Sequence, residues 1–183
     1  ETRHRLIMVA QLNTGLGELA RSKIRQVLGY QSLPYRIASR MLDIGSTLFH
    51  EGLSTTMTLQ RLKAPESDGR RPVSVKFKRL NHPIILRPGS RDVETLISNA
   101  VRLEYGQLRL PAKAPHFIVD AGAYIGDTSA YFLSAYPAAS VVALEPNLES
   151  FEIAARNLEA YGGRVKLLNK ALADRHGTLF LSG

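Results

Sequence analysis

The sequence predicts an α/β fold in which parallel strands alternate with helices, preceded by a β-hairpin and a mostly helical N-terminal extension. From Phe117 onward, short apolar segments of strand length alternate with longer segments of helical period. Strands joined by helical crossovers form a parallel sheet. Before that point, residues 73–86 alternate as a half-buried hairpin does, and residues 17–28 and the stretch after Pro34 have helical character.

The composition is that of an ordinary globular protein, with 183 residues, 44% of them hydrophobic and 22% charged. The absence of cysteine excludes disulfides and cysteine-ligated metal sites, and we expect no metal centre and a cytoplasmic location. Apolar runs such as residues 6–10 are far shorter than the roughly 20 residues that span a bilayer. We therefore expect no membrane span.

The net charge of +8 is concentrated in the first part of the chain. Residues 1–80 hold 14 Lys and Arg against 6 Asp and Glu, whereas residues 81–183 hold 10 of each. This excess fits a basic arm that contacts an acidic partner, anionic lipid or nucleic acid, but a solvated basic helical extension explains it equally simply. We favour the solvated extension and expect no nucleic-acid partner, because no aromatic residues for base stacking accompany the charge.

The N-terminal extension is expected to begin with an amphipathic helix over residues 17–28, ended by Gly29, with a second helix after Pro34. The segment KAPESDGRRP, residues 63–72, concentrates Pro, Gly, Ser and charge between patterned segments. We place the domain boundary in it, which predicts an extension over residues 1–70 and a second domain over residues 71–183.

The second domain should begin with a hairpin and a helix. Val73, Val75 and Phe77 alternate with polar residues, and a turn leads to a second apolar run at residues 84–86. Ser90 can cap the helix that follows. The core-facing residues of this helix would be Val93, Leu96, Ile97 and Ala100.

Three strands with two helical crossovers follow, at FIVDAG, SVVALEP and VKLLNKAL. The first crossover helix should run through Tyr136, and Asn147 should cap the second, which ends before Gly162. The apolar face predicted for this second helix consists of Leu148, Phe151, Ala155 and Leu158.

The turn after the first of these strands, residues 120–127, has the spacing G-x-x-x-G. In an open parallel sheet, ligands bind beyond the carboxyl ends of the strands. A dinucleotide site would need G-x-G-x-x-G, with a second glycine close to a pyrophosphate. Gly122 and Gly126 leave no such glycine between them, so a nucleoside ligand without phosphates, such as S-adenosylmethionine, suits the turn better.

Two carboxylates accompany this turn. Asp120 can act on the ammonium or sulfonium of a cationic ligand, and Glu145, at the end of the next strand, can accept both hydroxyls of a ribose. Taken singly, Asp120 could be only a cap and Glu145 only a surface charge. The order of strand, glycine turn, helix, strand and acid favours a binding site.

Residues 82–183 resemble the FkbM family of S-adenosylmethionine-dependent methyltransferases, which have a class I, Rossmann-like fold. The resemblance lies in HPIILRPGSRD, LEYGQL, FIVDAGAYIGDTSAYF, VVALEPNLESFEIAARNL and VKLLNKALADRHGTLFLSG. It implies S-adenosylmethionine as cofactor and methyl transfer to a hydroxyl of a small-molecule, sugar or lipid-linked acceptor. The order of the segments indicates the N-terminal half of such a sheet.

The resemblance also implies the residues of the cofactor site. They are Asp120, Gly122, Ala123, Tyr124, Gly126, Glu145, Pro146, Asn147, Lys170, Ala171, Glu104 and Tyr105. Arg87, Ser90 and Asp92, with Glu104 and Tyr105, match the upstream signatures, and they border the methionine end of the cofactor or form a local polar network. Ala171 stands where many class I enzymes have an acid for the adenine amino group, so Asn169, Lys170 or backbone would take that role.

A complete class I domain continues with further strands and an acidic motif after the fourth strand. We therefore expect the chain to be a fragment, inactive by itself, and we assign no catalytic base. Two alternatives stay open: an NAD(P)-dependent oxidoreductase that uses the same turn, and a non-enzymatic binding module with a basic N-terminal arm.

Overall fold

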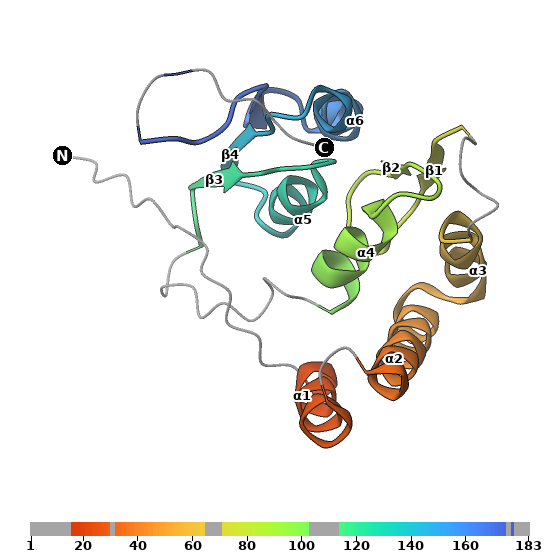
Figure 1. Cartoon of the computed structure of the whole chain (residues 1–183). Coiled ribbons are helices and arrows are strands. Elements are labelled where there is room, and N and C mark those ends of the chain that lie inside the picture. Colours follow the sequence, from red (N-terminus) through yellow and green to blue (C-terminus); the bar gives the residue numbers. More distant parts are fainter. Residues whose placement is uncertain (1–15, 30–31, 65–70, 103–113, 175–176, 178–183) are drawn as a thin grey trace. The chain divides into compact units, whose positions relative to one another are not determined.

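The computed structural model of the chain describes residues 16–29, 32–64, 71–102, 114–174 and 177 (Figure 1). The chain divides into two compact units near residue 111. We call the described part up to Arg102 the N-terminal unit and the described part from Ala114 the sheet unit. Each is described by itself.

Three helices open the N-terminal unit: α1 (Leu16–Leu28), α2 (Leu33–Glu51) and α3 (Leu53–Leu62). Gly29 ends α1 with a left-handed φ of 78°, its N–H donating to the carbonyl of Arg25. Ser32 caps α2, because its Oγ accepts from the N–H of Tyr35 at 3.2 Å. Gly52, with a φ of 89°, separates α2 from α3. The predicted helices of the extension are confirmed.

The predicted hairpin is also present in the N-terminal unit. Strand β1 (Val73–Val75) pairs antiparallel with β2 (Ile84–Leu86). Helix α4 (Asp92–Leu96) follows and continues without a break as a π-helical turn, η2 (Ile97–Val101). The core-facing residues predicted for this helix are all buried: Val93, Leu96, Ile97 and Ala100.

Long-range polar contacts join the hairpin and α4 to the helices of the extension. The guanidinium of Arg102 binds the carboxylate of Asp43 in α2 at 2.6 and 2.9 Å, and Glu51 accepts from the N–H of Lys78 at 2.8 Å. The structure thus places the hairpin and the extension in one compact unit. The domain boundary after residue 70 stays a prediction, and part of the predicted linker, residues 65–70, lies outside the described residues.

The sheet unit is α/β, with three parallel strands in the order β3 (Phe117–Ala121), β4 (Ser140–Leu144) and β5 (Val165–Leu168). Helix α5 (Asp127–Ala135) connects β3 to β4. Helix α6 (Leu148–Leu158) and the 3-10 segment η3 (Glu159–Arg164) connect β4 to β5. The strands and crossover helices predicted from the sequence are confirmed, and this arrangement is compatible with one half of a Rossmann-like sheet.

Helices α5 and α6 pack against each other and against the strands (Figure 1). The strand residues with buried side chains include Ile118, Val141 and Ala143, and the register pairs Ile118 with Val141. Because strand residues alternate between faces, the two helices cover one face of the sheet.

The apolar face predicted for α6 is wrong in part, because Leu158 is buried and Phe151 half-buried but the other two residues are not. Leu148 and Ala155 are exposed, whereas the side of α6 that is buried carries Ser150, Ile153, Ala154, Asn157 and Leu158. The helix has apolar residues on two sides, and a buried polar residue, Asn157, lies at the centre of the packed one. Asn147 does cap the helix, its Oδ1 accepting from the N–H of Ser150 at 2.9 Å.

None of the helices in the described parts of the chain is long and apolar enough to cross a membrane.

Candidate cofactor site

The carboxyl ends of β3, β4 and β5 meet at one edge of the sheet unit, as parallel strands require. The N–H groups of Gly122 and Ala123, just after β3, both donate to the carbonyl of Leu144 at the end of β4, at 2.9 Å each. The N–H of Glu145 donates to the carbonyl of Leu168 at the end of β5 at 3.0 Å. The structure therefore brings the three predicted segments of the site together.

Glycine is required in the turn after β3 for two different reasons. Gly122 has a φ of 88°, and a Cβ there would meet nothing within 4 Å, so the backbone faces open space that a ligand can enter. Gly126 has a φ of 79°, and its Cβ would lie 3.0 Å from the side chain of Leu158 in α6. The close packing at Gly126 is thus between the start of α5 and helix α6.

Four backbone N–H groups of this turn are occupied within the protein. Besides those of Gly122 and Ala123, the N–H of Tyr124 donates to Oε2 of Glu145 at 2.8 Å and that of Gly126 to the carbonyl of Ala123 at 2.7 Å. Asp127, the first residue of α5, is 2% exposed and brings negative charge to the helix terminus where a phosphate would bind. The turn is unfavourable for a pyrophosphate.

Glu145 is buried and holds the site together with both of its carboxylate oxygens. Oε2 accepts from the N–H of Tyr124, and Oε1 accepts from the N–H of Asn147 at 2.8 Å. Tyr124 itself has a φ of 50°, a conformation that a non-glycine residue adopts only when its surroundings favour it. Each carboxylate oxygen can accept a second hydrogen bond, which leaves capacity for ribose hydroxyls.

Asp120 lies on β3 and is half-buried. Its Oδ2 accepts a short hydrogen bond, 2.6 Å, from the hydroxyl of Ser129 in α5. Burial raises the pKa of Asp120 above its ordinary value of 3.8; the bonds from Ser129 oppose this shift, and the charge of Glu145 adds to it. A cationic ligand next to Asp120 would relieve that unfavourable burial of charge.

The segment after β5 contributes Asn169. Its Nδ2 donates to the carbonyl of Glu145 at 2.8 Å and to that of Pro146 at 3.1 Å. These bonds hold the backbone that follows β4, and Oδ1 takes no part in them. Lys170 and Ala171 are exposed. Residue 171 is an alanine and not the acid that many class I enzymes have there. The nearest side-chain acceptor in the sequence is Oδ1 of Asn169.

The sequence interpretation missed two residues that shape this site, Ser129 and Asn157. Asn157 is buried in α6, and its Nδ2 donates to the carbonyl of Ile125 in the turn at 2.8 Å. Asn157 lies away from the apolar face that the sequence predicts for α6, so no pattern in the sequence indicated its burial. Ser129 was not distinguishable from an ordinary polar residue of a helix.

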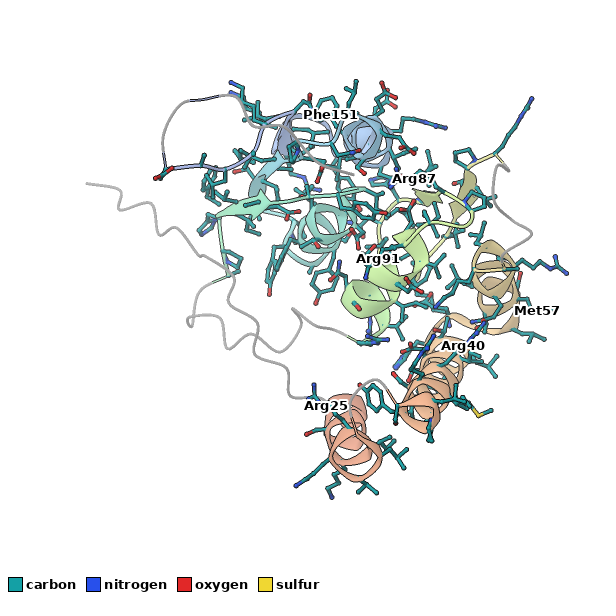
Figure 2. All side chains as sticks on the ribbon, in the orientation of Figure 1. Arg25, Arg40, Met57, Arg87, Arg91 and Phe151 are labelled. Carbon is teal, nitrogen blue, oxygen red and sulfur yellow. The ribbon has the colours of Figure 1, made fainter. Side chains whose placement is uncertain are left out.

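The upstream signature lies in the N-terminal unit and forms a local network. Arg87 donates to the carboxylate of Asp92 through its backbone N–H, Nε and Nη2 at 2.8 to 3.1 Å, and Asp92 is completely buried. The hydroxyl of Ser90 donates to the carbonyl of Arg87 and accepts from the N–H of Asp92. Figure 2 labels Arg87 next to β2. Glu104 and Tyr105, which the sequence also assigns to the site, lie outside the described residues.

Comparison with known proteins gives one partial match. A segment of 69 residues is 44% identical to a protein named methyltransferase sdnD from Sordaria araneosa, covering 36% of this chain and 26% of that protein. The chain thus spans about a quarter of that relative's length. No family model matches the chain, and no solved structure matches it. Membership of the FkbM family is therefore a proposal.

Proposed function

We propose that this chain carries the cofactor-binding part of an S-adenosylmethionine-dependent methyltransferase, related to the FkbM family, that methylates a hydroxyl of a small-molecule, sugar or lipid-linked acceptor. The observation that carries the proposal is the pair of carboxylates, Asp120 and Glu145, around a glycine turn in which four N–H groups are already occupied. Such a site suits a nucleoside that brings a cation and no phosphate. The partial match to a named methyltransferase supports the same reaction class.

Each part of the cofactor has a matching group in the sheet unit. Asp120 would attract the ammonium or sulfonium through charge, and the second lone pairs of Glu145 would accept the ribose hydroxyls. The open side of Gly122 would admit the ligand next to the backbone. Because Nδ2 of Asn169 is used on two carbonyls, an adenine amino group would donate to its Oδ1.

The bound cofactor would supply the electrophilic methyl group, and the protein would supply placement of that group in line with the acceptor oxygen. Glu145 would contribute to this placement in two ways. It would accept the ribose hydroxyls, and it holds the backbone of Tyr124 and Asn147 by their N–H groups. We assign no base to the methyl transfer. His82 and His116 do not follow the carboxyl end of any of the three parallel strands in the sequence, and His176 lies outside the described residues.

The nicotinamide alternative finds no support in this turn. A pyrophosphate at the start of α5 would meet the buried carboxylate of Asp127, and the turn offers no second glycine next to Gly122 for its close approach. The acceptor class rests on the sequence resemblance alone.

Calorimetric titration of the protein with S-adenosylmethionine, S-adenosylhomocysteine and NADH tests the proposal. We expect the two adenosyl compounds to bind and NADH not to bind. Glu145→Ala should weaken binding by about 10- to 100-fold, the loss of charged hydrogen bonds worth about 1.5–3 kcal/mol. Glu152→Ala, at an exposed position of α6, is the matched control and should bind normally. Binding of NADH, or of neither adenosyl compound, would overturn the assignment.

A further inference from the structure

Helix α2 presents a row of large apolar side chains to solvent. Leu33, Ile37, Met41 and Leu48 are spaced four, four and seven residues apart, which places them on one side of a helix. They are 67%, 51%, 69% and 44% exposed, and Phe49 next to them is 84% exposed. On α3, Leu53 and Met57, one turn apart, are exposed as well.

This row is not the side by which α2 packs into its own unit. The packed side of the helix carries Asp43, Thr47 and Glu51, all buried. It is fixed by the ion pair between Asp43 and Arg102 and by the bond from the N–H of Lys78 to Glu51. A row of large exposed apolar side chains on a helix that packs by another side indicates an interaction site.

The charges of these helices are distributed by sign. The exposed basic residues of α1, α2 and α3 with described side chains are Lys23, Arg25, Arg36, Arg40 and Arg61. The acidic residues with described side chains in the same helices are Asp43 and Glu51, and both are buried. Figure 2 labels Arg25, Arg40 and Met57 on the three helices. The solvent-facing charge described on α1–α3 is therefore entirely positive.

Two of the arginines border the apolar row directly. Arg36 follows Leu33 by three residues and Arg40 follows Ile37 by three, so each guanidinium begins next to the row on the helix surface. Their long side chains can extend along an apolar phase while the charge stays in the polar layer. We call the apolar row, Phe49, Arg36 and Arg40 together the α2 surface.

We propose that the α2 surface binds peripherally to a bilayer that contains anionic lipid. An amphipathic helix with Leu, Ile, Met and Phe on one face and Arg at its borders lies in the plane of the membrane interface, and anionic headgroups strengthen its binding. This inference goes beyond the proposed methyl transfer and does not depend on it. It also changes the interpretation of the basic extension, which the sequence alone had suggested to be merely solvated.

Charge complementarity selects this occupant over the others. A second copy of the chain would bring two surfaces of the same positive sign together, which costs free energy. A nucleic acid would leave the aliphatic side chains of the row without an apolar phase. The α2 surface offers Phe49 as its sole aromatic residue for base stacking. An anionic bilayer offers an apolar phase to the row and negatively charged headgroups to the arginines.

Flotation of the full chain with vesicles tests the proposal. Vesicles of phosphatidylcholine alone are compared with vesicles that contain phosphatidylglycerol at about a third of the lipid. We expect binding to the anionic vesicles, weakened by salt because the headgroup attraction is screened. Ile37→Glu/Met41→Glu should reduce that binding more than tenfold. Arg36→Glu/Arg40→Glu should also reduce it more than tenfold, because each arginine near an anionic surface strengthens binding about fivefold.

All four substituted residues are exposed, and the far-ultraviolet circular dichroism of both variants should match that of the unsubstituted protein. Leu148→Glu, which removes an exposed leucine from α6 in the sheet unit, is the matched control and should bind vesicles normally. Absence of binding to anionic vesicles by the unsubstituted protein would overturn the proposal. So would a dimer in sedimentation velocity that Ile37→Glu/Met41→Glu dissociates, because the α2 surface would then be a self-association interface.

Discussion

Two acidic clusters, one in each unit, differ in how their charge is balanced. In the N-terminal unit, Asp92 is completely buried and receives three hydrogen bonds from Arg87, two of them from the guanidinium. In the sheet unit, Asp120 and Glu145 are held by a hydroxyl and by backbone N–H groups. One cluster contains its own cation, and the bonds that hold the other come from neutral donors.

This difference supports a structural role for the first cluster and the proposed binding role for the second. A carboxylate already paired with a guanidinium gains little from a second cation, so the Arg87 and Asp92 pair serves to fix the turn between β2 and α4. A carboxylate that is buried among neutral donors keeps a negative potential that a cationic ligand can use. The sequence favoured a binding site at Asp120 and Glu145 and left two roles open for Arg87 and Asp92, and the side-chain partners now distinguish the two clusters.

The largest effect should follow from breaking the ion pair. Arg87→Ala leaves Asp92 buried without its cation, which should lower the free energy of unfolding by about 3–5 kcal/mol. The neutral pair Arg87→Gln/Asp92→Asn should lower it much less, because no charge stays buried. Urea unfolding followed by circular dichroism gives both values. Equal losses for the two variants would mean that charge balance is not what stabilises this turn.

A smaller effect is expected at the glycine turn. Gly126→Ala adds a left-handed alanine and a contact at 3.0 Å with Leu158, and we expect a loss of about 2–4 kcal/mol. Gly122→Ala adds the same backbone strain with no contact, so the expected loss is about 1–2 kcal/mol. Thermal unfolding of the two variants side by side measures the difference. If Gly122→Ala were the more damaging, the open space at Gly122 would be in doubt.

The smallest effect, of opposite sign, should come from Asp120→Asn. Because burial raises the pKa of Asp120 in the folded state, the stability that this group contributes is full below 3.8 and is lost as the pH rises through the raised pKa. Asparagine stays neutral and can still accept from Ser129. The variant should therefore be slightly more stable than the unsubstituted protein at neutral pH, and the difference should vanish as the pH falls towards 3.8. Melting temperatures across that pH range check the sign, and a variant less stable at neutral pH would contradict it.

The order of elements and the backbone positions of the site could be predicted from the sequence, because they depend on local rules. Period-2 and period-3.6 patterns locate strands and helices, and Asn147 and Gly29 act as the caps that their types predict. The positions of Gly122 and Glu145 at adjacent strand ends follow from the parallel connection alone.

What the sequence did not predict depends on contacts across space. The packed side of α6 was predicted only in part: Leu148 belongs to the apolar face that the pattern suggests, whereas Ile153 is buried next to the polar Asn157. The bond from Ser129 to Asp120 joins a helix to a strand, and no spacing rule anticipates it. The same holds for the ion pair between Arg87 and Asp92, which forms the local polar network that was one of the two roles expected for these residues.

The central claim is that the charge-unbalanced carboxylates at the strand ends, and not the balanced pair, bind the cofactor. Calorimetric dissociation constants for S-adenosylhomocysteine with Glu145→Ala and with Arg87→Gln/Asp92→Asn test it most directly. We expect Glu145→Ala to raise the dissociation constant by about 10- to 100-fold and the neutral pair to leave it within about twofold. Normal binding by Glu145→Ala together with lost binding by the folded neutral pair would contradict the account.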